Sequence, residues 1–202
     1  MDYSNQKQLT SFQSVILFFD IKRKIWHLFG LVIPIGYFYT DKNTTLLILL
    51  PLTVFALCLD LARLKSPGLN RLFIRYFGFL LKGQETKQLN GTTFFFSGAL
   101  VSILLFSKQA AIFSLVVLAV CDPLASIAGK SIGRIRIKGK TLEGSLAFCL
   151  TTFVLSLFFF EKITLLLVGG AMFAAFVEWV PAGLDDNLKI PILVAAYYHF
   201  LI

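Results

Sequence analysis

Long apolar runs separated by short polar stretches make up most of this chain. Seven runs approach the roughly 20 residues that one helix needs to cross the hydrocarbon core of a membrane. They are residues 25–39, 46–61, 92–106, 110–128, 145–160, 163–180 and 190–202. Several runs are short, so six or eight crossings also fit the pattern. We therefore predict an all-α, polytopic membrane helix bundle with about seven spans.

Two other apolar stretches, residues 12–19 and 69–81, are too short for a crossing. In the second, Arg71 and Arg75 fall on one helical face and apolar side chains occupy the other. This pattern is typical of a helix that lies in the membrane interface.

Lysine and arginine are distributed unevenly over the loops between the runs. If the N-terminus is cytoplasmic, the opposite side of the membrane keeps only Lys42, Lys108 and Lys162. Cytoplasmic loops carry an excess of these residues, so we predict a cytoplasmic N-terminus and polar clusters on the cytoplasmic side. Residues 1–24 are expected to form a cytoplasmic or interfacial segment, and residues 25–202 a single transmembrane catalytic domain.

The composition agrees with a multi-pass integral membrane protein. Hydrophobic residues make up 57% of the chain and charged residues 15%, whereas soluble domains carry about 25% charged residues. The net charge of +8 sits in short loops and not on one basic face, which argues against nucleic-acid binding. The three cysteines lack the paired spacing of a zinc site or a disulfide framework.

An acid followed by cations interrupts the fourth apolar run. Ionisable groups in or at the end of a span are costly and usually mark a functional site. If the span is helical through Lys130, one stripe holds Asp122, Ser126, Gly129, Lys130 and Gly133. On it, Asp122 can hold magnesium, the glycines admit phosphate oxygens and Lys130 neutralises them. The stripe also fits plain helix packing, because its small residues, with Ala125, suit a close crossing.

The loop that follows, residues 134–140, adds further cations and leads into the fifth run. One interpretation is a lid in which Lys138 or Lys140 clamps phosphates while Glu143 positions magnesium or a lysine. The other is structural: Thr141 caps the next helix and the lysines anchor it at the membrane surface.

Acids also cluster near the start of the last run, on the same predicted face. Asp185, Asp186 and Asn187 are adjacent in a turn. They suit a second magnesium anchor, or a base that deprotonates an attacking hydroxyl group, and equally a solvated turn. Glu178, at the end of the preceding run, is either another site acid or an end anchor.

Four earlier polar residues are weaker candidates: Arg23, His27, Glu85 and Asn90. Arg23 and His27 are four residues apart at the mouth of the first span, where they can contact an anion or a lipid headgroup or simply anchor the helix. Glu85 and Asn90 precede the third span and suit a site or a helix start. Asp60 and Arg63 are expected to form an ion pair that closes the second span.

The order of these motifs resembles the CTP-dependent lipid-alcohol kinases, namely dolichol kinase, phytol kinase and CTP-dependent diacylglycerol kinase. The matching segments are residues 23–27, 85–91, 122–130, 140–145 and 185–191. The segment 122–130 resembles that family's Asp…Gly-Lys core, and Lys-Thr-Leu-Glu-Gly-Ser at 140–145 resembles its Lys-Ser-x-Glu-Gly-Ser. Cys121 and Pro123 depart from the family pattern, which often has glycine and a small residue there.

The resemblance implies transfer of the γ-phosphoryl group of a nucleoside triphosphate, CTP in this family, to the hydroxyl group of a membrane lipid alcohol at the cytoplasmic face, with magnesium. A Phe-rich interior suits diacylglycerol, phytol or a polyprenol equally. The roles expected on this basis are Asp122 and Glu143 at magnesium, Lys130 and Lys140 at phosphates, and Asp185 or Asp186 at a second metal or the acceptor hydroxyl group.

Two alternatives remain open at this point. A phosphatidate cytidylyltransferase has a similar central region, but its late Asp-Arg-x-Asp signature is replaced here by residues 185–187, which favours the kinase. A small ion-coupled transporter would use Asp122 and Glu178, and it leaves the cationic loop of residues 134–140 unexplained.

Overall fold

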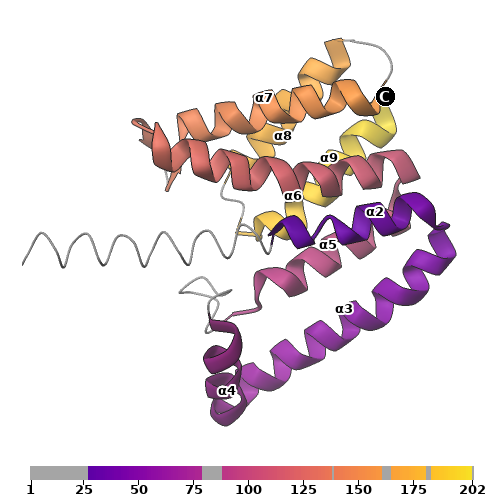
Figure 1. Cartoon of the computed structure of the whole chain (residues 1–202), viewed down its shortest axis with the longest axis vertical. Helices are drawn as coiled ribbons and strands as arrows, with labels where there is room; N and C mark the ends of the chain where they lie inside the picture. Colours follow the sequence, from indigo (N-terminus) through magenta and orange to yellow (C-terminus); the bar gives the residue numbers. More distant parts are fainter. Residues whose placement is uncertain (1–26, 79–87, 138, 161–164, 181–182, 202) are drawn as a thin grey trace, which may run out of the picture.

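Apolar helices running roughly along one axis make up most of the computed structural model, which describes residues 27–78, 88–137, 139–160, 165–180 and 183–201 (Figure 1). The helices are α2 (Val32–Tyr39), α3 (Lys42–Lys65), α4 (Pro67–Phe77), α5 (Gly91–Leu105), α6 (Lys108–Ser131), α7 (Leu142–Phe159), α8 (Leu165–Trp179) and α9 (Asp186–Leu201). Two short strands, β1 (Arg136–Ile137) and β2 (Lys140–Thr141), form an antiparallel pair between α6 and α7.

Each apolar run of the sequence coincides with one of these helices, so the prediction of a helical membrane protein is confirmed. Among the residues described, α3, α6 and α7 are long and apolar enough to cross a membrane, and α5, α8 and the stretch from His27 to Tyr39 are shorter apolar helices. The count of seven spans and the cytoplasmic N-terminus stay predictions. The apolar stretch 12–19 lies outside the described residues.

Helix α6 is the centre of the bundle. It packs against α2, α5, α7 and α9, and Phe113, Val117 and Cys121 are fully buried along it. It continues through Pro123, whose missing N–H leaves the carbonyl of Ala119 without its usual helical donor. Asp122 therefore lies within a continuous helix and not at a helix start.

The crossing of α6 and α7 is tight because glycines line it. A Cβ atom on Gly129 would lie 2.4 Å from Thr141 Oγ1, and one on Gly133 would lie 2.7 Å from Thr141 Cγ2. Thr141 also caps α7, accepting the Gly144 N–H at 3.1 Å. The packing and capping interpretations of these residues are thus observed, and a phosphate contact at the two glycines stays a prediction.

A buried polar network joins α3 to the start of α5. Asp60, fully buried, accepts hydrogen bonds from Arg63 Nε at 2.5 Å, Asn90 N at 2.9 Å and Thr93 Oγ1 at 2.6 Å. Asn90 also donates from its side-chain amide to Asp60 and caps α5 through the Thr93 N–H. The predicted Asp60–Arg63 ion pair is confirmed, and Asn90 has a structural role here.

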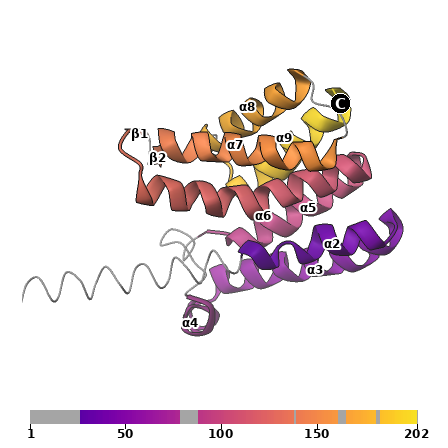
Figure 2. The same cartoon turned by 45° about the horizontal axis from the view of Figure 1, so that its top comes forward.

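Helix α4 lies across the end of α3, close to perpendicular to it (Figures 1 and 2). Ser66 caps it, Pro67 occupies its first turn, and none of its residues is buried. Apolar Leu72 and Tyr76 are exposed on it, together with Arg71 and Arg75. It matches the interfacial helix predicted from residues 69–81 in position and amphipathic character.

Candidate active site

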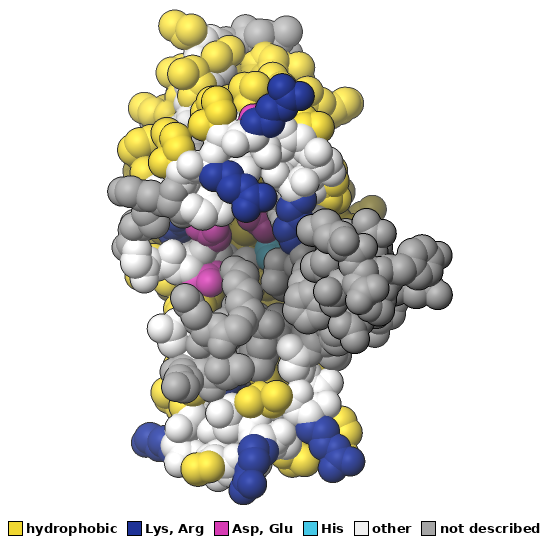
Figure 3. All heavy atoms as spheres, turned by 90° about the vertical axis from the view of Figure 1, so that its left-hand side faces the viewer, with side chains coloured by type: hydrophobic (Ala, Val, Ile, Leu, Met, Phe, Trp, Pro, Cys, Tyr) yellow, Lys and Arg dark blue, Asp and Glu magenta, His cyan; other side chains and the backbone are white. Residues whose placement is uncertain are grey.

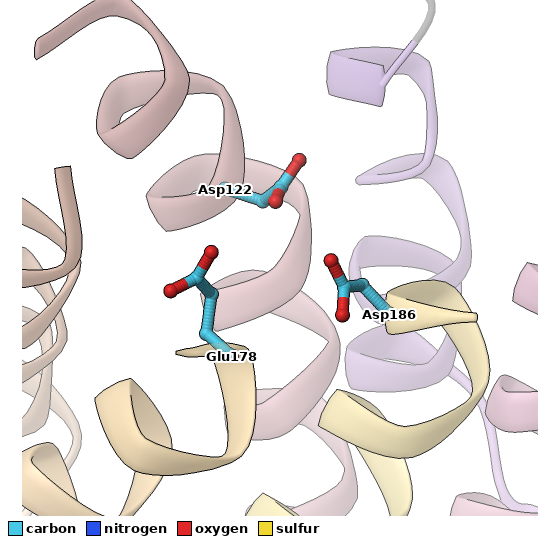
Figure 4. A group of neighbouring side chains, drawn as sticks. All are labelled: Asp122, Glu178 and Asp186. Carbon is cyan, nitrogen blue, oxygen red and sulfur yellow. The ribbon is translucent and has the colours of Figure 1, made fainter. Parts of the chain in front are cut away.

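Three carboxylates from three helices converge at one end of the bundle (Figure 4). Asp122 comes from the second half of α6, Glu178 from the last turn of α8 and Asp186 from the first turn of α9. One oxygen from each lies within 4.8 Å of the others. We call these residues the acid cluster. Glu178 is buried and the other two are half-buried, so their negative charges are only partly solvated.

Two lysines bind the acid cluster. Lys140 Nζ lies 2.6 Å from Glu178 Oε1 and 2.9 Å from Asp186 Oδ2, and it also donates to the backbone carbonyl of Glu178. Lys189 Nζ lies 2.8 Å from Asp186 Oδ1 and donates to the carbonyl of Val180 at 2.5 Å. The lysines thereby tie strand β2 and the start of α9 to the end of α8.

Burial would by itself lower the pKa of Lys140, because it disfavours the charged amine. The attraction of Asp186, with the hydrogen bond and attraction of Glu178, outweighs this effect, and the pKa of Lys140 is raised above its ordinary value of 10.5. Lys140 is therefore a cation at any physiological pH.

His27 closes the acid cluster on the side of α2. Its Nε2 lies 3.9 Å from Asp122 Oδ2, and the two side chains are 23% and 29% exposed. This separation leaves room for a bridging hydroxyl group or water. Figure 3 views this end of the molecule, where acidic side chains and a histidine gather in a hollow with basic side chains around it.

The structure thus brings together four residues that the sequence singled out: His27, Asp122, Lys140 and Asp186. Asn187 is buried next to them, and its N–H donates to the Asp185 side chain at 2.9 Å. Asp185 accordingly shapes the turn into α9. Further along α6, Ser126 is half-buried and Lys130 is exposed.

Glu143 lies apart from the acid cluster. Its Oε1 accepts the backbone N–H groups of Arg134 at 2.9 Å and Ile135 at 3.4 Å, so it fastens the loop before β1 to the first turn of α7. Its assignment to magnesium stays a prediction. Three other candidates, Arg23, Glu85 and Lys138, lie outside the described residues.

Glu178 and Lys189 belong to the site although neither was selected as a site residue from the sequence. The sequence leaves Glu178 open as a site acid or an end anchor, and in the structure its Oε2 also accepts a hydrogen bond from Ser145 at 3.0 Å. The available signal for Lys189 was its spacing, three residues after Asp186 on one helix face.

Comparison with known proteins places this chain in a family. CTP-dependent diacylglycerol kinase 1 of Eremothecium gossypii is 28% identical over 91% of this chain and 67% of its own length. The kinase of the same name from Schizosaccharomyces pombe is 30% identical over 70% of this chain and 74% of its own length. The chain belongs to the CTP-dependent lipid kinase family. A dolichol kinase of Saccharomyces cerevisiae is 58% identical over a segment of 45 residues, 21% of this chain and 9% of that kinase.

No protein-family model matches the chain, and no solved structure matches it. The resemblance seen in the order of the motifs is confirmed by the relatives above, which are lipid kinases by name. Chemically, the acid cluster and its lysines offer carboxylates beside cations, and phosphoryl transfer is a reaction in which catalysis rests on positioning and charge neutralisation.

Proposed function

We propose that this protein transfers the γ-phosphoryl group of CTP to the hydroxyl group of a membrane lipid alcohol, with diacylglycerol as the first candidate acceptor. The observation that carries the proposal is the acid cluster with Lys140 at one end of a bundle of apolar helices. Such an end can meet a water-soluble nucleotide and a membrane-dissolved hydroxyl group together. The names of the relatives supply CTP and diacylglycerol.

The acid cluster fits magnesium by the chemistry of its donors. Carboxylate oxygens are the ligands that this hard cation prefers, and Asp122, Glu178 and Asp186 offer them from three separate helices. When bound, the ion would offset the charge of the phosphate oxygens. We place Glu178 in this set on geometry, with Glu143 retained as a second, more distant candidate.

Lys140 and Lys130 are the proposed phosphate contacts. Lys140 is in contact with the acid cluster itself. Its positive charge, which is paired with Glu178 and Asp186, can pair with phosphate oxygens when a nucleotide binds. Lys130, one turn beyond Ser126 on α6, is exposed and can reach a more distal phosphate group.

We place the acceptor hydroxyl group between His27 and Asp122. A general base has to lie within hydrogen-bond reach of the proton that it removes, and His27 Nε2 and Asp122 Oδ2, 3.9 Å apart, are close enough for one oxygen atom beside the line that joins them to contact both. His27 Nε2 takes the proton, and Asp122 stabilises the imidazolium that forms. This arrangement replaces Asp185 as a candidate base.

The proposed topology has seven spans with the acid cluster on the cytoplasmic side, where nucleotides are found. Its support is the distribution of cations between the two ends of the bundle. Arg63 and Lys140 are among the cations concentrated at the acid-cluster end, whereas Lys42 and Lys108 lie at the other end. This asymmetry follows the positive-inside pattern.

The deciding experiment uses purified protein in mixed micelles with magnesium, γ-labelled CTP or ATP, and diacylglycerol, phytol, farnesol or a polyprenol. We expect label in diacylglycerol from CTP, with CDP released. Label from α-labelled CTP in a lipid supplied as phosphatidate would instead identify a cytidylyltransferase, and no label in either format would refute the proposal. Asp122→Asn tests the site. Its matched control is Asp41→Asn, because Asp41 is the N-cap of α3 and lies away from the acid cluster.

A further inference from the structure

An apolar groove opens between α2, α6 and α7 in the half of the bundle away from the acid cluster. Its volume is about 690 Å³, within the range of about 300–1,000 Å³ found for small-molecule sites. The residues that line it include Pro34, Ile35, Phe38, Ile112, Val116 and Phe159. Ile35 and Phe38 are more than half exposed at its rim, so the groove opens sideways toward the surrounding lipid.

The groove and the acid cluster lie along the same seam between α2 and α6. The two helices are antiparallel: His27 faces Asp122 at one end of the seam, and Lys108 meets the carbonyl of Phe38 at the other. Val116 precedes Asp122 by six residues on α6, about 9 Å along the helix axis. A molecule in the groove can therefore extend one end to the place proposed for the acceptor hydroxyl group.

The far end of the groove is closed by hydrogen bonds between the three helices. Lys108 Nζ donates to the carbonyls of Phe38 at 3.0 Å and Thr40 at 2.7 Å, and Gln109 Nε2 donates to the carbonyl of Phe159 at 2.6 Å. These hydrogen bonds pair the polar side chains at that end with backbone carbonyl groups. What remains is an apolar lining whose closed end lies about 21 Å from Asp122, because Lys108 precedes Asp122 by 14 positions on α6.

We propose that this groove holds one hydrocarbon chain of the acceptor lipid, whose hydroxyl group lies at His27 and Asp122. The inference rests on the proposed function and adds the place of the acceptor's tail. An apolar groove with a lateral opening takes a chain from the bilayer without passing it through water, and the closed end limits how much of the chain is held. Ile35, Ile112 and Val116 then determine chain-length preference.

The test compares dioctanoylglycerol with dioleoylglycerol as acceptors for Val116→Trp and Ile35→Trp, two variants that fill the groove from different helices. The measured quantity is kcat/KM for the long chain divided by that for the short chain. The chain moves between bilayer and groove without meeting water, so its exclusion is steric: an indole ring occupies the space of a chain that extends past it, and we expect this ratio to fall about tenfold in both variants. Leu47→Trp, on a 76% exposed side chain of α3, is the control and should leave the ratio within about twofold.

A second measurement does not depend on variants. Wild-type protein is irradiated with a diacylglycerol that carries a diazirine at the end of one chain, and the labelled peptides are mapped. We expect label on α6 around Ile112 and Val116, removed by excess unlabelled diacylglycerol and not by phosphatidylcholine. Equal removal by phosphatidylcholine would show that bulk bilayer lipid fills the groove, and label elsewhere would also overturn the inference.

The two proposals fail in different ways. A wild-type protein that phosphorylates diacylglycerol while both tryptophan variants keep its chain-length ratio refutes the groove and leaves the kinase intact. A wild-type protein without kinase activity refutes the proposed function, and the labelling pattern still decides what the groove binds.

Discussion

Replacing Lys140 with methionine removes a cation held between two partly buried carboxylates. The Glu178 side chain is 9% exposed and lies 2.6 Å from Lys140 Nζ. Leaving such a charge without its partner costs about 3–5 kcal/mol. The lower end applies here, because Asp186 keeps Lys189 at 2.8 Å and the Lys140 side chain is itself 28% exposed. We expect a loss of about 3 kcal/mol, more than a hundredfold in the folding equilibrium.

The assay is equilibrium unfolding in mixed micelles for Lys140→Met, Glu178→Gln and the double variant. Neutralising Glu178 removes the stranded charge, so the double variant should be more stable than the sum of the single losses predicts, with a coupling of about 2 kcal/mol. Lys42→Met is the control, since the hydrogen bond that Lys42 donates to the Leu104 carbonyl is exposed, and it should cost under about 1 kcal/mol. Additivity within about 0.5 kcal/mol would refute the Lys140–Glu178 pair.

Three further predictions concern activity, packing and pH. Asp122→Asn should lower the rate of phosphoryl transfer to lipid at least about a hundredfold, as the loss of one charge-stabilising contact in a transition state does. Its free energy of unfolding should stay close to that of wild type. A stable, fully active variant would contradict the site. Gly129→Ala should cost about 1–3 kcal/mol because its Cβ would meet a side chain at 2.4 Å, whereas Gly36→Ala, with nothing within 4 Å, should stabilise slightly; equal effects would contradict the tight crossing. The pKa of Lys140 is raised above 10.5 in the folded protein. Its contribution to the free energy of unfolding is therefore complete below pH 10.5 and is lost as pH rises through the folded pKa. The difference in free energy of unfolding between wild type and Lys140→Met should accordingly stay constant from pH 7 to about 9.5.

The helices were predictable because the membrane leaves the backbone few choices. A chain in hydrocarbon satisfies its peptide groups within helices or closed barrels, so each apolar run became a helix. The ends were less accurate: α6 extends over Lys108–Ser131, beyond the apolar run 110–128, because its polar first and last turns continue the same hydrogen bonding. Pro123 did not interrupt it, since packing on several sides outweighs one lost bond.

The site was predictable where polar groups interrupt or border an apolar run. Asp122 interrupts the fourth run and Asp186 stands in the polar turn before the last run, and the fold brings them together from two helices. Glu178 ends an apolar run without a neighbouring motif, and its contact with Lys140 joins residues 38 positions apart. That contact depends on how α7 and α8 are rotated against each other, which hydrophobic periodicity in an all-round apolar helix does not encode.

Glu143 shows the opposite case. Its position in the Lys-Thr-Leu-Glu motif suggested magnesium, but the backbone amides of Arg134 and Ile135 lie nearer and engage one of its oxygens. Asn90 suited a site or a helix start from its sequence, and the structure shows it as the cap of a helix. Local backbone donors compete for polar side chains, and spacing along the chain does not reveal which partner wins.

The network around Asp60 also constrains how the protein is made. Helix α3 carries the buried ion pair of Asp60 and Arg63, and the acid also accepts hydrogen bonds from Asn90 and Thr93. At about 5–20 residues per second, the ribosome needs about 2–6 s to add those 30 residues. During this interval Asp60 has Arg63 beside it but lacks the donors of Asn90 and Thr93, so we expect α3 to reach its final packing only after α5 has been made.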